Sequence, residues 1–439
     1  MANQIVTTQK ISDTLLPAFV VTSALLNNSN MDLARAYEQG GIYGIGGDVQ
    51  IRKYPRFIAS STDLAPIPTG GITVTPQDIQ QETETLTIEK LFDVAINLNV
   101  IERTLQLRED KAFNQSIVNP ILLALKQEVM AYLYKKFVDS LYIFNGDGTT
   151  PINSYSQISS TCAIMDEFQM PKDRSLILSA VDSATFAASQ VFNNFRKETI
   201  DDVWENGYIN MINGFRTFSD ENVRTHQAGT ASTNSGITLS VNAIDGDTTL
   251  TLTGLNAAET LVVGDKIVID TTDPLGVNIF AVSPIGKEIV SNNLYKLGFV
   301  VAPAPASNPD YNSTTQTYTA PGATMTVSVV NPVRTITTTD QYAYISAPND
   351  LLPAGLPLTI LGNHRTNPAI CNKLSMSVAA PPIHKLEAGA ITTTSMLDSI
   401  TINCSMQSQV AQLQNLFVCY LQIGALVHPE YAVGLISQG

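Results

Sequence analysis

The sequence predicts an α+β protein in which a β-rich module interrupts a mixed α/β domain. Two Asn-Gly pairs, Asn206-Gly207 and Asn213-Gly214, bracket a short apolar strand, and Asn-Gly favours a tight turn because both residues tolerate positive φ. From Gln227 to about Ile345 the chain becomes rich in Thr, Val, Asn and Gly and poor in helix formers. A strong helix pattern precedes the module, and patterns of both helices and strands lie on either side of it. Together these patterns predict an α+β protein.

Composition bounds the class of protein. The chain has 439 residues, enough for two to three domains with a sizeable core. Hydrophobic residues make up 44% and charged residues 15%, which is typical of a globular protein. The formal net charge of -14 argues against tight non-specific binding to DNA or RNA and against an anionic membrane surface.

Residues 1–41 are expected to form an amphipathic N-terminal arm. Ile11, Leu15 and Phe19 share one helical face, with Pro17 introducing a break or kink. An ordinary N-terminal helix packed on its own domain is an equal alternative. The first residues lack a basic stretch, so no secretory signal is predicted.

Residues 42–100 predict a long β-hairpin. Its first limb is centred on Val49–Phe57, its tip is the breaker-rich segment Pro66–Gly71, and apolar residues alternate along its returning limb from Leu86 to Val100. A hairpin of this length has no small core of its own to fold onto. We therefore expect it to lie on something else, such as a neighbouring subunit.

Residues 114–143 carry the strongest helix pattern, because apolar residues recur every fourth position from Ile121 to Leu141. Asn119-Pro120 fits an N-cap followed by Pro at the first helical position. The predicted helix spans roughly 35–45 Å at 1.5 Å per residue. Its predicted stop is Asn145–Gly148.

The rest of the chain alternates between mixed α/β and β patterns. Residues 157–204 predict mixed structure, with a buried strand at Leu176–Leu178 and a helix capped by Asp182 or Ser183. Residues 229–345 predict a small barrel or sandwich. Its strand candidates are Thr238–Val241, Thr248–Leu252, Lys266–Ile269, Gly298–Val301 and Met325–Val330. Beyond residue 346, strands are predicted at Ser399–Met406 and Leu416–Leu421.

Patterns for catalysis are missing. The glycine-rich segment Gly40–Gly47 does not fit a nucleotide-binding loop, and Asp245-Gly-Asp247 fits a turn between strands. The histidines never recur at ligand spacing, and the cysteines form no CxxC pair, so we expect the cysteines to be buried thiols of a reducing cytoplasm. These residues are His226, His364, His384 and His428, and Cys162, Cys371, Cys404 and Cys419. No catalytic, cofactor-binding or metal-binding residue is predicted, and no enzyme activity.

The order of these parts resembles a family of viral shell proteins. Leu86–Leu98 and the long helix resemble the hairpin return and spine helix of the P22 coat protein family of tailed-phage major capsid proteins. Gly264–Ile267 and Val329–Val333 resemble that family's inserted domain, and His428–Leu435 its C-terminal end. The resemblance covers nearly the whole chain, and it rests on the order of the motifs.

The resemblance implies an HK97-like capsid fold with a long spine helix, an extended β-hairpin loop and an inserted Ig-like or telokin-like β-barrel. The implied divisions are an N-terminal arm (1–41), an extended loop (42–100), a peripheral domain with the spine helix (101–145), an axial domain (146–228 and 346–395), the inserted domain (229–345) and returning peripheral strands (396–439).

The resemblance also implies function and partners. Copies of the chain would form the hexamers and pentamers of an icosahedral shell around double-stranded DNA, without sequence-specific binding and without a membrane. A separate scaffolding protein, and a portal protein at one vertex, are the expected partners. The protein would reside in the virion and assemble in the host bacterial cytoplasm. Asp13 is the candidate scaffold contact.

One family feature is missing, and other classes stay open. Gly229–Ala243 lacks the carboxylates with which the family bridges capsomers, so those contacts are not expected here. An encapsulin-like compartment shell protein and a β-rich surface or adhesin protein are alternatives. The inserted module argues against the first, and the missing secretory signal and long internal helix argue against the second.

Overall fold

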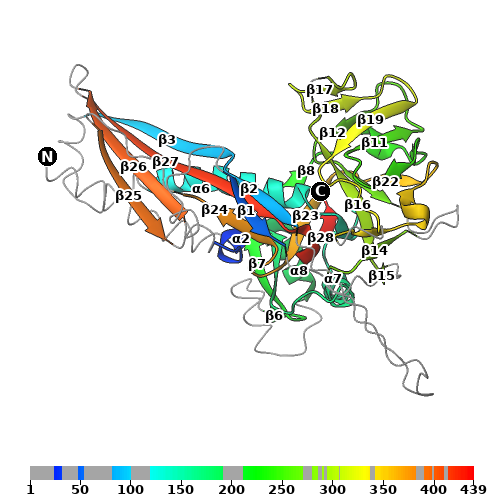
Figure 1. The fold of residues 1–439 in the computed structure, drawn as a ribbon. Helices are drawn as coiled ribbons and strands as arrows, with labels where there is room; N and C mark the ends of the chain where they lie inside the picture. The colour runs from blue at the N-terminus through cyan, green and yellow to red at the C-terminus, as the bar shows by residue number, and fades with distance from the viewer. Residues whose placement is uncertain are drawn as a thin grey trace, which may run out of the picture.

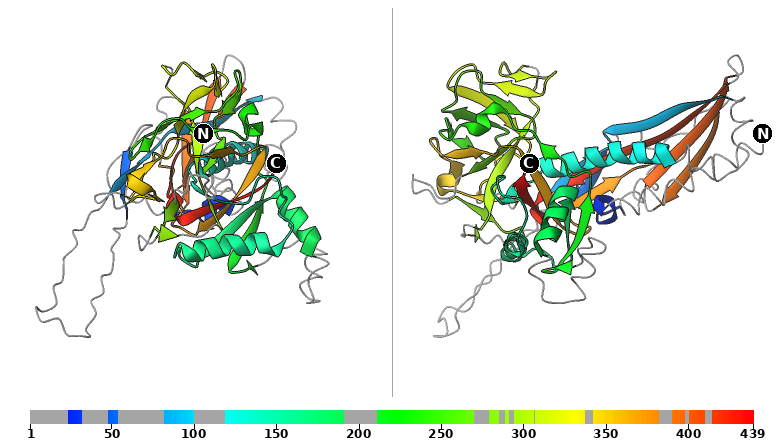
Figure 2. Two further views of the ribbon diagram at one scale, coloured as in Figure 1. Left: turned by 90° about the vertical axis from the view of Figure 1, so that its right-hand side faces the viewer. Right: turned by 180° about the vertical axis from the view of Figure 1, so that it is seen from behind.

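A long helix and an antiparallel sheet project from one side of the molecule, while a β-rich lobe lies at the other side (Figures 1 and 2). Between them lies a body of mixed helices and strands. The computed structural model describes residues 24–31, 48–53, 82–99, 119–190, 211–269, 279–284, 289–290, 294–305, 307–336, 342–381, 390–397, 400–409 and 414–439. Within these ranges the protein is α+β, as predicted.

Helices contribute a minority of the described residues. The helices are α2 (Ala24–Asn27), α6 (Asn119–Asp139), α7 (Tyr155–Glu167) and α8 (Ala180–Gln190), with 3-10 turns η2 (Thr230–Thr233), η3 (Pro348–Asp350) and η5 (Pro429–Tyr431). The predicted long helix is α6, which begins near Asn119-Pro120 as expected. It ends at Asp139, before the predicted stop, because the apolar residues that follow enter the body as a buried strand, Ile143–Asn145.

The projecting sheet is built from segments far apart in sequence. Its strands are β3 (Lys90–Asn99), β24 (Met376–Ala379), β25 (Ala390–Leu397), β26 (Ile400–Gln409) and β27 (Gln414–Val427). They pair in the order β24-β27-β26-β25, and β3 pairs with β27 in antiparallel register. Helix α6 runs along this sheet (Figure 2).

The helix and the sheet share one apolar core. Burial of every fourth residue of α6 explains its amphipathic pattern, and the alternating apolar residues of the strands supply the opposite side. The buried members of this core include Val129, Leu133 and Phe137 of α6 and Phe417, Leu421 and Ile423 of β27. At 1.5 Å per residue the 21 residues of α6 extend about 31 Å.

The predicted returning limb of the hairpin divides into two strands with different partners. Only β2 (Thr83–Thr87) pairs with β1 (Asp48–Arg52), whereas β3 joins the projecting sheet. The division has a packing cause: Leu86 and Ile88 enter a small cluster with Ala379, while Phe92 and Val94 pack toward α6. Part of the predicted returning limb therefore buries its apolar residues within the same chain.

The body contains a mixed sheet whose strands run in the order β6-β7-β5-β23-β28-β4. They are β4 (Ile143–Asn145), β5 (Arg174–Ser179), β6 (Met211–Ile212), β7 (Phe215–Asp220), β23 (His364–Cys371) and β28 (Ala432–Gln438), with β8 (Thr225–His226) beside β23. Asn213-Gly214 forms the predicted tight turn between β6 and β7, with φ of 46° and 85°. Asn206-Gly207 lies outside the described residues.

The β-rich lobe continues from the body sheet through one strand. Strand β16 (Lys296–Ala302) pairs with β4 at its start and with β19 (Thr324–Val329) at its end. The path continues to β11 (Thr249–Thr253) and β9 (Thr238–Leu239), while β13 (Lys266–Ile269) pairs with β16 and β22 (Leu358–Ile360). All five strands predicted for the module therefore occur.

Short strands complete the lobe. They are β10 (Ala243–Ile244), β12 (Thr260–Val262), β14 (Phe280–Val282), β15 (Ile289–Val290), β17 (Tyr311–Asn312), β18 (Thr317–Thr319), β20 (Ile345–Ser346) and β21 (Leu351–Leu352). The predicted turn at Asp245-Gly-Asp247 is present, with Gly246 at φ 89° and the Ile244 amide donating to Asp247 Oδ2 over 2.8 Å.

Candidate functional site: the charged base of the hairpin

Five charged or ionisable side chains gather where β1 and β2 meet the rest of the molecule. We call this group the hairpin-base network; its members are Lys53, Glu82, Glu84, Arg334 and His428. They come from three separate parts of the sequence: the hairpin, the β-rich module and the segment after β27. The network therefore joins three regions of the protein at one place.

The strongest pair in the network connects the hairpin to the β-rich module. The Arg334 guanidinium donates from Nη2 to Glu82 Oε1 over 2.7 Å and from Nη1 to Glu82 Oε2 over 3.0 Å. This bidentate, charge-assisted geometry is more directional than a single ion pair. Tyr342 adds a contact from the same segment of the module, because its hydroxyl accepts a bond from the Glu82 amide over 3.3 Å.

The remaining contacts run along the hairpin toward the C-terminal segment. Lys53 Nζ lies 2.5 Å from Glu84 Oε1 and 3.8 Å from Glu82 Oε2, and it lies over the Tyr342 ring. Glu84 Oε2 in turn lies 3.1 Å from His428 Nδ1. The charges thus alternate in sign from Arg334 through Glu82 and Lys53 to Glu84.

These contacts favour the ionised carboxylates. The bidentate hydrogen bonds from Arg334 hold the pKa of Glu82 below its usual value despite partial burial. Burial alone would raise the pKa of Glu84, but the His428 ring and the Lys53 ammonium outweigh burial, so this pKa is also lowered. The folded protein therefore stabilises both negative charges.

A hollow of about 340 Å³ lies beside the network. Its lining mixes cations, carboxylates, tyrosines and the residues Ala425–Val427 of β27. The charged lining residues are Lys53, Glu84, Glu89, Lys136, Arg334 and Glu430. Such a lining lacks the predominance of apolar surface that characterises a small-molecule pocket.

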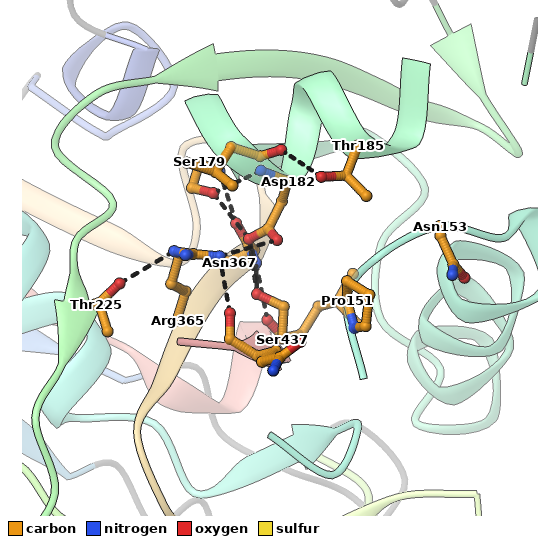
Figure 3. A network of polar contacts seen from close by, with 12 residues as sticks. Pro151, Asn153, Ser179, Asp182, Thr185, Thr225, Arg365, Asn367 and Ser437 are labelled. Carbon is orange, nitrogen blue, oxygen red and sulfur yellow. Dashed lines mark hydrogen bonds and ion pairs between the residues drawn. The ribbon is translucent and has the colours of Figure 1, made fainter. Parts of the chain in front are cut away.

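A second polar network lies buried in the body (Figure 3). The Asp182 carboxylate, 1% exposed, accepts bonds from the Ser179 hydroxyl at 2.8 Å and the Ser437 hydroxyl at 2.7 Å. Asn367 Nδ2 donates to it at 3.0 Å, and Arg365 Nη1 lies 3.4 Å away. We call these five residues the Asp182 network; it joins α8, β23 and β28.

The start of α8 explains how Asp182 enters this network. The predicted helix cap at Asp182 or Ser183 lies one turn earlier, because the Ser179 hydroxyl accepts the Asp182 amide at 3.0 Å. Asp182 thus stands in the first turn of the helix, where a negative charge is favourable.

A third cluster lies where α6 and the β-rich module meet. His226 Nε2 and Asp265 Oδ1 are 2.6 Å apart, and the His226 and His364 rings lie 5.4 Å apart between centroids. Lys266 is buried above the Phe144 ring, and burial lowers its pKa to about 8 against the opposing effect of Asp139 and Asp265. The cluster fixes this junction and lies beside a hollow of about 250 Å³ whose lining includes Asp139, Arg224 and His226.

The sequence-predicted site residues have mixed outcomes. Asp13 lies outside the described residues. Across the described ranges, no three His, Cys, Asp or Glu side chains gather closely enough to hold a metal ion. All four cysteines are buried free thiols, as predicted. In the described parts of the chain, no helix combines the length and apolar composition needed to cross a membrane.

Sequence reasoning missed the hairpin-base network. Arg334 and Glu82 are 252 positions apart, and neither stands in a motif. Only the fold brings them together, so a single sequence carries no local signal for the pair.

Comparisons with known proteins return likenesses among solved structures. No protein-family model and no curated protein matches the chain. A chain from Mycobacterium phage Che8 is 9% identical, with a TM-score of 0.46 over 94% of this chain and 91% of that one. The capsid of Ralstonia phage GP4 gives 7% identity and a TM-score of 0.40 over 90% and 84%, and the mature capsid of bacteriophage PhiM1 gives 7% and 0.39 over 89% and 82%.

Proposed function

We propose that this chain is the major capsid protein of a tailed double-stranded DNA phage. Its copies assemble into the icosahedral shell that encloses the genome. The protein is structural and acts through its surfaces, and it resides in the virion after assembly in the host cytoplasm.

One observation carries the proposal: α6 lies along a sheet that projects from the body, and the hairpin base lies at the root of that sheet (Figures 1 and 2). This is the arrangement that the sequence resemblance implies for a spine helix, returning peripheral strands and an extended loop. The three parts come from residues 48–99, 119–139 and 376–427. They lie together in space although they are far apart in the sequence.

The edges of the projecting sheet support a role in assembly. Among the described strands, β3 pairs only with β27, and β25 pairs only with β26. Long edges with unpaired backbone groups are a liability in a monomer. They suit a protein whose surfaces are covered by further copies under closed symmetry.

The finer family assignment is also a proposal. We infer an HK97-like fold of the P22 coat type with an inserted β-barrel. Supporting the barrel, the Leu239 amide donates to the Leu356 carbonyl at 2.9 Å, and the Leu358 amide donates to the Ile237 carbonyl at 3.0 Å. These bonds connect β9 with the start of β22 and carry the hydrogen bonding further around the lobe.

We propose the domain divisions implied by the resemblance with two adjustments. Strand β3 is grouped with the peripheral domain, because it pairs with β27 along ten residues. Strands β24 and β25 are likewise grouped with the peripheral domain, because they belong to the same projecting sheet. The arm (1–41), the first axial segment (146–228) and the inserted domain (229–345) keep their boundaries.

The partners follow from the same proposal. Self-association gives hexamers and pentamers, a separate scaffolding protein directs them, and a portal protein occupies one vertex. Asp13 remains the proposed scaffold contact. If it has this role, Asp13→Ala weakens co-assembly with the scaffold; unchanged co-assembly contradicts the role.

Negative-stain electron microscopy tests the proposal. The chain is expressed alone and together with the product of the upstream neighbouring gene. Closed shells, or polymers that become uniform on co-expression, are the expected result. A monodisperse monomer in both samples would overturn the capsid proposal.

A further inference from the structure

We propose that Arg334 is a positioning residue for assembly: through Glu82 it holds the base of the hairpin against the β-rich module and so sets the direction in which the hairpin leaves the subunit. The inference rests on the proposed shell function. It assigns to the inserted module a task within its own chain, in addition to any contact with neighbouring copies.

The hairpin base has little structure of its own to fix its position. Among the described strands, β1 and β2 form a sheet of two strands, separate from the other sheets. A two-stranded ribbon is only marginally stable by itself. Within the described residues, its buried apolar support is a small cluster of Leu86, Ile88 and Ala379, with Ile51 and Leu426 packed against it. Polar contacts therefore have a large share in orienting the ribbon.

Arg334, in contrast, extends from a backbone that the module holds firmly. Its carbonyl accepts bonds from the Tyr344 and Ile345 amides at 3.2 and 3.1 Å. The neighbouring Thr335 amide donates to Asp245 Oδ1 at 3.0 Å, and the Thr335 hydroxyl donates to the Asp350 carbonyl at 2.7 Å. The guanidinium thus starts from a fixed point.

The Arg334–Glu82 pair is suited to orienting the hairpin base more than to stabilising the folded chain. The side chains of Arg334 and Glu82 are 30% and 33% exposed, so water screens their attraction and limits its effect on the free energy of unfolding. The two parallel hydrogen bonds nevertheless fix the carboxylate in one plane, which a single lysine contact does not do. The expected consequence of breaking the pair is a folded chain with a loosened hairpin base.

The first measurement is hydrogen exchange on the unassembled chain, comparing wild type with Arg334→Gln. We expect amides of Thr83–Thr87 to exchange about three- to tenfold faster in the variant, while β23 and β28 keep their rates. Arg216→Gln is the matched control, because Arg216 forms an exposed ion pair with Asp173 elsewhere in the body. Unchanged exchange in Thr83–Thr87 would overturn the inference.

The second measurement is the diameter distribution of assembled particles by electron microscopy. We expect Arg334→Gln to broaden the distribution or give open sheets, Arg334→Lys to do so less, and Arg216→Gln to match wild type. The double variant Arg334→Glu with Glu82→Arg restores a pair of opposite charges. We therefore expect its diameter distribution to be narrower than that of the single variant Arg334→Glu. Wild-type diameters in Arg334→Gln would contradict the inference.

The two measurements separate this inference from the shell function. If wild type fails to assemble under all conditions, the shell function fails, while hydrogen exchange still decides whether Arg334 holds the hairpin base. If wild type assembles and the variant assembles identically, the shell function stands and the positioning role is rejected.

Discussion

The Asp182 network and the hairpin-base network both connect distant segments through a carboxylate, but they differ in burial. Asp182 is 1% exposed and surrounded by two hydroxyls, an amide and a guanidinium, whereas the side chain of Glu82 is 33% exposed. Removing partners from a buried charge leaves its desolvation cost uncompensated. An exposed pair regains water when it breaks.

The difference separates two tasks that polar contacts perform. The Asp182 network holds α8, β23 and β28 in one arrangement and contributes to stability. The hairpin-base network contributes little free energy of unfolding, yet it restrains the direction of a ribbon that has only a small apolar cluster. Substitutions in the two networks should therefore affect different measurements.

The largest expected effect is that of Asp182→Ala. It leaves Asn367, Ser437 and Arg365 without their shared acceptor, and we expect a loss of about 3–5 kcal/mol in the free energy of unfolding. Denaturant unfolding of the unassembled chain measures this loss. Asp93→Ala, at an exposed position of β3, is the control and should change stability by at most about 0.5 kcal/mol. An equal loss of unfolding free energy in Asp182→Ala and Asp93→Ala would contradict the stabilising role of the Asp182 network.

Lys266→Met tests the buried junction next to the module. Burial lowers the folded-state pKa of Lys266 from 10.5 to about 8, so between these values the unfolded chain binds more protons and stability rises with pH. The wild-type free energy of unfolding should increase by on the order of 3 kcal/mol across this window. The variant should lack that increase; an identical pH profile would show that Lys266 is not responsible.

Gly424→Ala acts on the contact between β27 and the hairpin base. A Cβ at Gly424 would lie 2.4 Å from the Thr87 carbonyl oxygen, so the two backbones must separate. Overpacking of this kind costs about 1–3 kcal/mol and should speed amide exchange in β2. Gly322→Ala is the control, because a Cβ at Gly322 meets nothing within 4 Å. Equal exchange in both variants would contradict this contact.

The smallest expected effect is loosening of the hairpin base in acid. The pKa values of Glu82 and Glu84 are lowered in the folded state, so their stabilising contribution is present above the usual carboxyl pKa and is lost as pH falls through the folded values. Below about pH 4 we expect faster exchange in β2, corrected for intrinsic rates, at a cost of less than about 1 kcal/mol. Arg334→Gln should show a weaker response to acid; a response equal to wild type would exclude the Arg334–Glu82 pair as its source.

The fold was largely accessible from local pattern. Period-four apolar residues predicted α6, alternation predicted β26, and the apolar run Leu416–Leu421 predicted β27. The Asn213-Gly214 and Asp245-Gly-Asp247 turns were identified from turn chemistry. The end of α6 was predicted too late. Leu141–Phe144 are apolar enough to continue a helix, yet the chain leaves the helix and Ile143 begins the buried strand β4. Tertiary burial decided that boundary.

The candidate site was not accessible from local pattern. Lys53, Glu82 and Arg334 look like ordinary surface charges in the sequence, and their pairing depends on how the module is placed on the hairpin base. Strand β3 illustrates the same limit, since alternation alone cannot say whether a strand pairs with β1 or with β27. Long-range partners are fixed by the whole fold.

Cryo-electron microscopy of particles assembled from this chain tests the central claim most directly. The account predicts closed shells of hexamers and pentamers in which α6 and the projecting sheet of each copy lie in the shell wall, with the hairpin of one copy placed against a neighbour. Particles without such symmetry, or a protein that remains monomeric with its scaffolding partner present, would contradict it.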